Sequence, residues 1–138
     1  MDYIRSSKYN ENLIHEKIMG PNPIKLAEEL LTSHQIPNHA TVMDLGCGRG
    51  LTSEQIIPIH ANATDLPFAE KFFDTVIPID FYNYFGRDTE YLGKCLLPLI
   101  KHGGYLYIAI PGMTKDCHGY LSTRVITFMD IRTAGLYS

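Results

Sequence analysis

Residues 41–50 read Thr-Val-Met-Asp-Leu-Gly-Cys-Gly-Arg-Gly, and this stretch decides the fold. The apolar residues Val42, Met43 and Leu45 predict a short buried strand. The strand ends at glycines on alternate positions, which permit positive φ in a tight turn and let a ligand approach the backbone. A helix is predicted from Leu51, and its first N–H groups would point back into the turn. Strand, turn and helix start together predict a cradle of nucleotide size.

The acid before the turn narrows the class of ligand. Asp44 stands near the carboxyl end of the strand, where a carboxylate suits a cationic amine better than a pyrophosphate. Leu51 occupies the place at which the dinucleotide pattern Gly-x-Gly-x-x-Gly has its third glycine. Both features disfavour NAD and favour a ligand with an amino acid at one end and an adenosine at the other.

The stretch 42–50 resembles the first motif of the S-adenosylmethionine-dependent methyltransferases with a Rossmann-like fold. Residues 62–68 (Asn-Ala-Thr-Asp-Leu-Pro-Phe) resemble the segment after the family's third strand, and residues 73–77 resemble the lead into its fourth. The resemblance covers about residues 20–112, with one internal gap. It implies an α/β fold: a mostly parallel sheet with helices on both faces, incomplete relative to the family.

The resemblance also implies a cofactor site for S-adenosyl-L-methionine. Its methionine part would be held by the carboxylate before the turn and by the turn backbone, its adenine would be flanked by the 62–68 segment, and a second carboxylate would lie near its amine. The residues so implied are Asp44, Gly46, Cys47, Gly48, Gly50, Asn62, Ala63 and Asp80. Relatives often carry Asp where this chain has Asn62.

No catalytic residue is implied, because the sulfonium leaving group is already activated and the protein chiefly supplies alignment. Residues 81–86 (Phe-Tyr-Asn-Tyr-Phe-Gly) follow a parallel strand and could line a substrate pocket, or pack on the next helix. Tyr82, Tyr84 and His118 are candidate acceptor-side groups, with packing or a surface position as the alternative.

The connection after the first strand is short. A βαβ unit usually takes about 30 residues or more, and the chain allows about 20 from Thr41 to Ala61. The family's second strand, which ends in a ribose-binding acid, is missing. One hypothesis places a strand 57–61 in the vacant position, with Asp65 as the ribose-binding acid. The alternative is that Asp65 caps the turn at Leu66-Pro67.

The chain is predicted to be a single domain, 1–138, with an N-terminal helical segment (1–39), a cofactor-binding core (40–112) and a C-terminal tail (113–138). Helices are predicted over 12–19, over 23–32 with Asn22 as N-cap, and over 88–102 with a bend at Pro98. Further strands are predicted over 72–80 and 105–110, with Pro78 removing a ladder donor. Gly-Pro-Asn-Pro at 20–23 also occurs in a methyltransferase subgroup whose N-terminal segment covers the cofactor; a plain helix boundary is the alternative.

Composition sets outer limits. The 138 residues are 45% hydrophobic with a net charge of −3, which disfavours nucleic-acid partners. No apolar stretch of signal-peptide or membrane-spanning type is present. The three cysteines are far apart, which favours a reducing, cytoplasmic location, and no Cys/His pairs stand at zinc spacing. Open sheet edges would allow oligomers.

Three functions remain compatible with the sequence. The first is methyl transfer from S-adenosylmethionine to a small-molecule acceptor. The second is a non-catalytic, shortened relative that binds the cofactor weakly or not at all. The third is another Rossmann-like nucleotide binder, such as an NAD enzyme.

Overall fold

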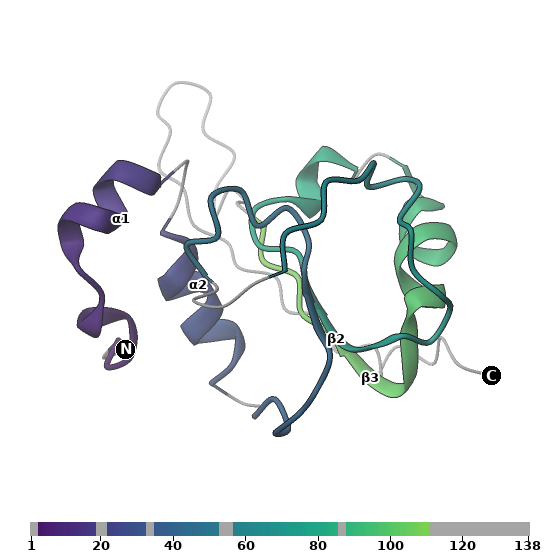
Figure 1. Ribbon diagram of the computed structural model, residues 1–138, viewed down its shortest axis with the longest axis horizontal. Coiled ribbons are helices and arrows are strands. Elements are labelled where there is room, and N and C mark those ends of the chain that lie inside the picture. Colours follow the sequence, from purple (N-terminus) through teal and green to yellow (C-terminus); the bar gives the residue numbers. More distant parts are fainter. Residues whose placement is uncertain (1–2, 19–21, 33–34, 53–56, 86–87, 111–138) are drawn as a thin grey trace, which may run out of the picture.

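A computed structural model describes residues 3–18, 22–32, 35–52, 57–85 and 88–110. Its centre is a parallel sheet in the order β1-β2-β3, formed by Val42–Asp44, Phe73–Ile77 and Ile100–Leu106. Helical segments flank the sheet, with α2 on one side and the segment that precedes β3 on the other (Figure 1). The predicted α/β class is therefore confirmed.

Both N-terminal helices begin after an asparagine cap, of which the sequence predicted Asn22, and the first spans 11–17 instead of the predicted 12–19. Helix α1 spans Glu11–Lys17, and the Asn10 side chain accepts hydrogen bonds from two N–H groups of its first turn. Helix α2 spans Pro23–Leu30, and Asn22 accepts from the N–H groups of Ile24 and Lys25 at 3.1 and 3.2 Å. Proline at the first helical position is compatible with this cap because it lacks only an N–H that has no helical partner. The helix ends at Leu30, two residues before the predicted end.

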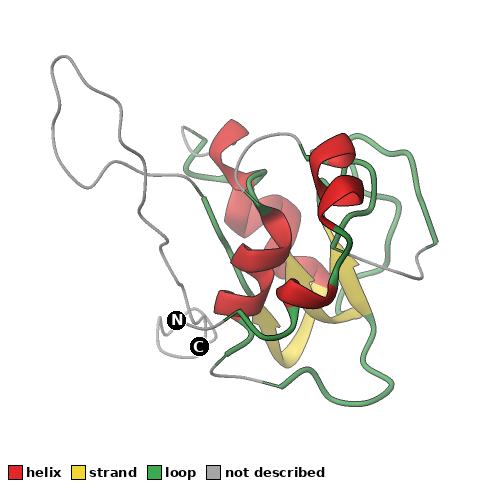
Figure 2. Cartoon of the chain, turned by 90° about the vertical axis from the view of Figure 1, so that its left-hand side faces the viewer, coloured by secondary structure: helices red, strands yellow, loops and turns green. Residues whose placement is uncertain are grey.

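The sheet has an apolar cluster on each face, because side chains alternate between the two faces of a strand. Val76 and Leu106 pack with Leu96 and Tyr91 from the segment before β3. The next residues along each strand join the opposite cluster with α2, which contains Leu26, Leu30, Ile77, Ile79, Tyr107 and Ala109. The strands lie side by side with helices packed against them (Figure 2). Burial on both faces explains the apolar residues of β2 and the apolar run from Leu106 to Ala109.

The N-terminal segment is fastened to α2. The Glu28 carboxylate accepts hydrogen bonds from the backbone N–H groups of Arg5 and Ser6, each at 2.8 Å. The Tyr3 hydroxyl donates to Glu29, and the Lys25 ammonium lies 5.2 Å from the centre of the Tyr3 ring. The backbone hydrogen bond from Arg5, followed by the hydrogen bonds from Ser6, lowers the pKa of the Glu28 carboxyl. The described part of this segment, residues 3–18, is therefore fastened to α2 near its start.

Several predicted boundaries are wrong. Strand β2 ends at Ile77, so Pro78 lies just beyond it, where its carbonyl still accepts from the Ala109 N–H at 3.3 Å. The predicted helix 88–102 is helical only over residues 91–99. Residues 100–104 belong to β3 as an irregular start, and β3 ends at Leu106, before the predicted end at residue 110. The helical segment before β3 consists of a π-helical turn, η3 (Leu92–Leu96), and a 3₁₀ turn, η4 (Leu97–Leu99), which contains Pro98. Proline removes a helical hydrogen bond, so the helix stops there instead of bending.

The predicted strand 57–61 is also wrong. These residues form no strand and pair with none within the described ranges, and Ile57 and Ile59 are 89% and 54% exposed. Within the described residues β1 pairs on one side only, with β2. Residues 51–52 form turns, and the rest of the predicted helix there, at 53–56, lies outside the described residues, as do Pro111, Gly112, His118 and the whole tail 113–138. No helix in the described ranges has the length and apolarity needed to cross a bilayer.

Asp74 connects the start of β2 to Thr41 and Lys101, and it makes the free energy of unfolding depend on pH in the acid range. Its carboxylate accepts from the Lys101 ammonium at 2.8 and 2.9 Å and from the Thr41 N–H at 2.8 Å. The Lys101 hydrogen bond, followed by that from Thr41, holds the pKa of Asp74 below its ordinary value. Stability from this carboxylate is therefore present above the unfolded-state pKa of about 3.9 and is lost as pH falls through the lower native pKa.

We therefore expect the urea midpoint of the wild-type protein to fall more steeply than that of Asp74→Asn between about pH 5 and pH 2.5. The exposed Glu70 has no hydrogen bond among those of the described residues, so Glu70→Gln serves as the control and is expected to follow the wild type. Parallel curves for Asp74→Asn and the wild type would contradict the prediction.

Candidate functional site

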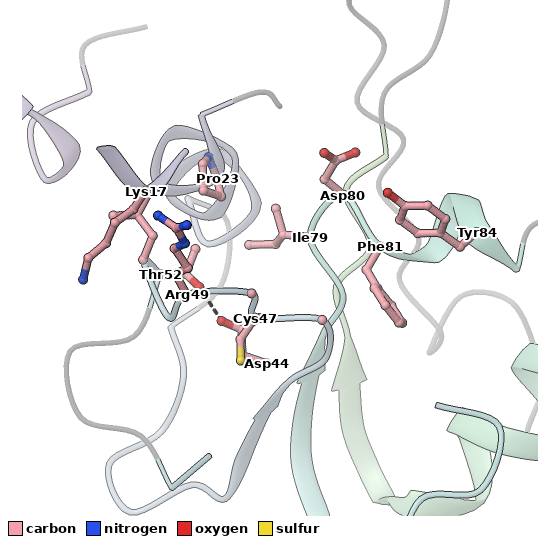
Figure 3. Close-up of a pocket in the computed structure, with 13 residues that line it drawn as sticks. Lys17, Pro23, Asp44, Cys47, Arg49, Thr52, Ile79, Asp80, Phe81 and Tyr84 are labelled. Carbon is pink, nitrogen blue, oxygen red and sulfur yellow. Dashed lines mark hydrogen bonds between the residues drawn. The ribbon is translucent and has the colours of Figure 1, made fainter. Parts of the chain in front are cut away.

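A cavity of about 390 Å³ opens where β1 and β2 end (Figure 3). Its size is within the range of about 300–1,000 Å³ typical of small-molecule sites. It contains two carboxylates, two cationic side chains and two aromatic rings, contributed by the N-terminal segment, by the glycine turn and by the loop after β2. The lining residues are Lys17, Pro23, Asp44, Gly46, Cys47, Gly48, Arg49, Leu51, Thr52, Ile79, Asp80, Phe81 and Tyr84.

The glycine turn has the backbone that the sequence predicts. Gly46, Gly48 and Gly50 have φ angles of +78°, +54° and +70°. The Gly50 N–H donates to the Cys47 carbonyl at 2.8 Å and closes the turn. These angles are unfavourable for residues with a Cβ atom, which explains the alternating glycines.

The close approach that glycine allows is used by the chain itself. A Cβ atom on Gly46 would overlap the ring of Phe81 and would lie 2.8 Å from its Cβ atom. The sequence predicts that a ligand would approach the bare backbone here, whereas the structure places an aromatic side chain against it. The glycine turn and the loop after β2 therefore form one packed corner of the cavity.

Asp44 is half-buried on the cavity wall and is oriented by a residue that the sequence did not indicate. The Thr52 hydroxyl donates to Oδ2 of Asp44 (Figure 3). Thr52 lies eight residues after Asp44 in the sequence, and the glycine motif does not indicate this contact. Burial, with a smaller contribution from the Asp44 charge, raises the pKa of the Cys47 thiol, which favours its uncharged form on the cavity wall.

Two cations also line the cavity, and neither was predicted as a site residue. Arg49 comes from the glycine turn, and its Nη1 donates to the Glu16 carbonyl near the end of α1 at 3.1 Å. Lys17 is the last residue of α1, and Pro23 is the first of α2. Lys17 and Pro23 thus bring the N-terminal segment to the cavity wall, whereas residues 19–21 between them lie outside the described residues.

Asp80 enters the cavity from the loop after β2. Its N–H donates to the Ala109 carbonyl at 2.7 Å, and its φ angle is +52°, a left-handed conformation that aspartate adopts more readily than most residues. Burial raises the pKa of the Asp80 carboxyl. In Figure 3 it lies on the side of Phe81 and Tyr84, away from Lys17, Arg49 and Thr52.

Several predicted site residues do not line the cavity. Asn62 and Asp65 face each other in a tight turn, in which the Asn62 side chain accepts from the Thr64 N–H at 3.1 Å. The Ala63 carbonyl accepts from the buried Tyr91 hydroxyl at 3.0 Å, which fastens this turn to the apolar cluster that contains Tyr91, Val76 and Leu106. Gly50 closes the glycine turn without lining the cavity.

The two candidate tyrosines have different positions. Tyr82 packs against Tyr91, with ring centres 6.1 Å apart, and burial raises the pKa of its hydroxyl. Tyr84 lines the cavity and is 75% exposed. The structure therefore assigns Tyr82 to packing and leaves Tyr84 available to a ligand.

A zwitterionic or cationic organic ligand is the class that these side chains suit. No group of three or more His, Cys, Asp or Glu residues in the described ranges is arranged to hold a metal ion.

Comparisons of the chain with protein-family models, with curated proteins and with solved structures found no match.

Proposed function

We propose that the cavity binds S-adenosyl-L-methionine and that the chain transfers its methyl group to a small-molecule acceptor. The observation that carries the proposal is the joining of an acid and a glycine turn at one edge of a cavity of suitable size. Asp44 and the Gly46–Gly48 backbone lie on the same wall, at the carboxyl end of a parallel strand. Ligands of open α/β sheets bind at such strand ends.

The charges on this wall match an α-amino acid head group. Asp44, oriented by Thr52, would accept hydrogen bonds from the ligand ammonium. Arg49 and Lys17 would neutralise its carboxylate, and a guanidinium can contact both oxygens of a carboxylate at once. A pyrophosphate would meet the Asp44 charge instead, which disfavours a dinucleotide.

The order of the strands supports a Rossmann-like arrangement. The segments that form β2 and β3 resemble the family's fourth and fifth strands, and in the doubly wound order 3-2-1-4-5 these strands follow the first. The observed order β1-β2-β3 is compatible with the 1-4-5 part of that sheet. S-adenosylmethionine would supply a methyl group on a positively charged sulfur, and the chain's own residues would hold and align it.

Binding of the product, S-adenosylhomocysteine, tests this proposal by calorimetry and thermal unfolding of the full chain. Ligand at 100 times its dissociation constant is expected to add about 2.7 kcal/mol to the free energy of unfolding. Asp44→Asn is expected to weaken binding by about tenfold or more, because it removes the charged partner of the ligand ammonium. Glu70→Gln, away from the cavity, is the control and should bind as the wild type does.

Binding of NAD together with no binding of S-adenosylhomocysteine would overturn the proposal. Unchanged affinity in Asp44→Asn would overturn the assignment of the head group to that wall.

A second candidate is a non-catalytic relative that binds the cofactor weakly or not at all. It is favoured by the position of Asn62 and Ala63, which the resemblance assigns to adenine but which lie outside the cavity lining. Competition experiments distinguish the two candidates. If adenosine competes with S-adenosylhomocysteine, the nucleoside half of the ligand has a site. If methionine competes and adenosine does not, the second candidate is favoured.

A further inference from the structure

The aromatic side of the cavity has the composition of a site for an organic cation. The Asp80 carboxylate is half-buried, and Phe81 and Tyr84 lie beside it in the chain, with ring centres 5.9 Å apart and planes at 54°. All three line the cavity. Aromatic faces attract ammonium groups, and a neighbouring carboxylate adds charge attraction and a hydrogen-bond acceptor.

Asp80 is not neutralised by a cation of the chain within the described residues. The ion pairs found there join Lys94 to Glu90 and Lys101 to Asp74. The cations of the cavity, Lys17 and Arg49, lie on the other side in Figure 3. A partly desolvated carboxylate without a cationic partner is unfavourable, and a bound cation would remove that cost.

We propose that Asp80, Phe81 and Tyr84 form the acceptor subsite and that the acceptor is a small organic amine. This inference rests on the proposed function, and it assigns Asp80 to the acceptor, whereas the family resemblance implies a position beside the methionyl amine. The exposed ring of Tyr84 offers the amine a face at the cavity mouth, and the Asp80 carboxylate binds its ammonium.

The same placement supplies the proton acceptor that amine methylation requires, since an ammonium nitrogen has no free electron pair. One ammonium proton passes to an Asp80 oxygen. The nitrogen electron pair then forms the bond to the methyl carbon, the bond between that carbon and sulfur breaks, and its electron pair stays on sulfur. The raised pKa of the Asp80 carboxyl makes it a better proton acceptor than an exposed aspartate.

Benzylamine and benzyl alcohol are the matched probes, because they have similar shape and differ in charge. We expect the full chain, titrated by NMR at neutral pH, to bind benzylamine at least about tenfold more tightly than benzyl alcohol. Asp80→Asn keeps the size of the side chain and tolerates positive φ, and it should abolish this preference. Tyr84→Leu should weaken benzylamine binding about two- to fivefold. Glu70→Gln is the control and should retain the preference.

S-adenosylhomocysteine affinity of the same variants distinguishes the two proposals. Asp80→Asn is expected to bind it within about twofold of the wild type, whereas Asp44→Asn loses about tenfold or more. Equal affinity for both benzyl probes, or a loss of S-adenosylhomocysteine affinity in Asp80→Asn as large as in Asp44→Asn, would overturn the amine subsite. Benzylamine binding that depends on Asp80, with no binding of S-adenosylhomocysteine, would support the subsite and overturn the cofactor.

Discussion

Gly46→Ala is expected to lower the free energy of unfolding by about 2–5 kcal/mol, from two contributions. A Cβ atom at φ +78° costs about 1–2 kcal/mol. Its overlap with Phe81 adds an overpacking cost of about 1–3 kcal/mol, because the ring must leave its place on the turn. Urea unfolding of the purified protein measures the change.

Two other glycines separate these contributions. Gly103 has φ +74° with open space where a Cβ would lie, so Gly103→Ala carries only the cost of about 1–2 kcal/mol for the backbone. Gly93 lies in η3, also beside open space, and Gly93→Ala is expected to stabilise by about 0.5–1 kcal/mol because alanine is the better helix former.

The contact with Phe81 has its own check. In the Phe81→Ala background, Gly46→Ala should cost less than in the wild type, since the overlapping ring is gone. An equal cost in both backgrounds would contradict the packed corner, and Gly46→Ala as mild as Gly103→Ala would do the same.

Leu96→Ala is expected to cost about 2–5 kcal/mol, the usual range for a fully buried leucine. Leu96 has no exposed surface and packs between Tyr91 and the strand residues Val76 and Leu106. Alanine does not weaken the helical turn around it, so the loss would come from apolar contact and the cavity left behind. The urea midpoint should fall while the slope of the transition stays the same.

Leu13→Ala is the matched control. Leu13 is also helical, in α1, but it is 40% exposed, and its truncation should cost well under half as much as that of Leu96. Similar losses at both positions would mean that the cluster around Val76 is not the centre of stability. The function of the cavity does not enter this comparison, because neither leucine lines it.

The sequence alone determined the features that depend on a few neighbouring residues. Asn22 with Pro23 predicted the start of α2, because the cap needs only the two N–H groups that follow. The glycines after Asp44 predicted positive φ, because sterics at a single residue set that preference. Apolar residues predicted β1, β2 and the end of β3, because strand residues that face an apolar cluster are themselves mostly apolar.

Tertiary structure alone decided where those elements meet. Thr52 contacts Asp44 where the chain turns back on itself. Phe81 packs on Gly46, and Lys17 lines the same cavity as both, although these residues lie far apart in the sequence. No local sequence pattern encodes these contacts. Tertiary contacts also explain the wrong boundaries. Residues 100–104 pair with β2 as part of β3, against their predicted helix propensity. The apolar stretch 57–61 pairs with no strand within the described residues. Local preferences are worth tenths of a kcal/mol to about 1 kcal/mol per residue, whereas burial and pairing in the sheet add over many contacts, so the larger sum decides.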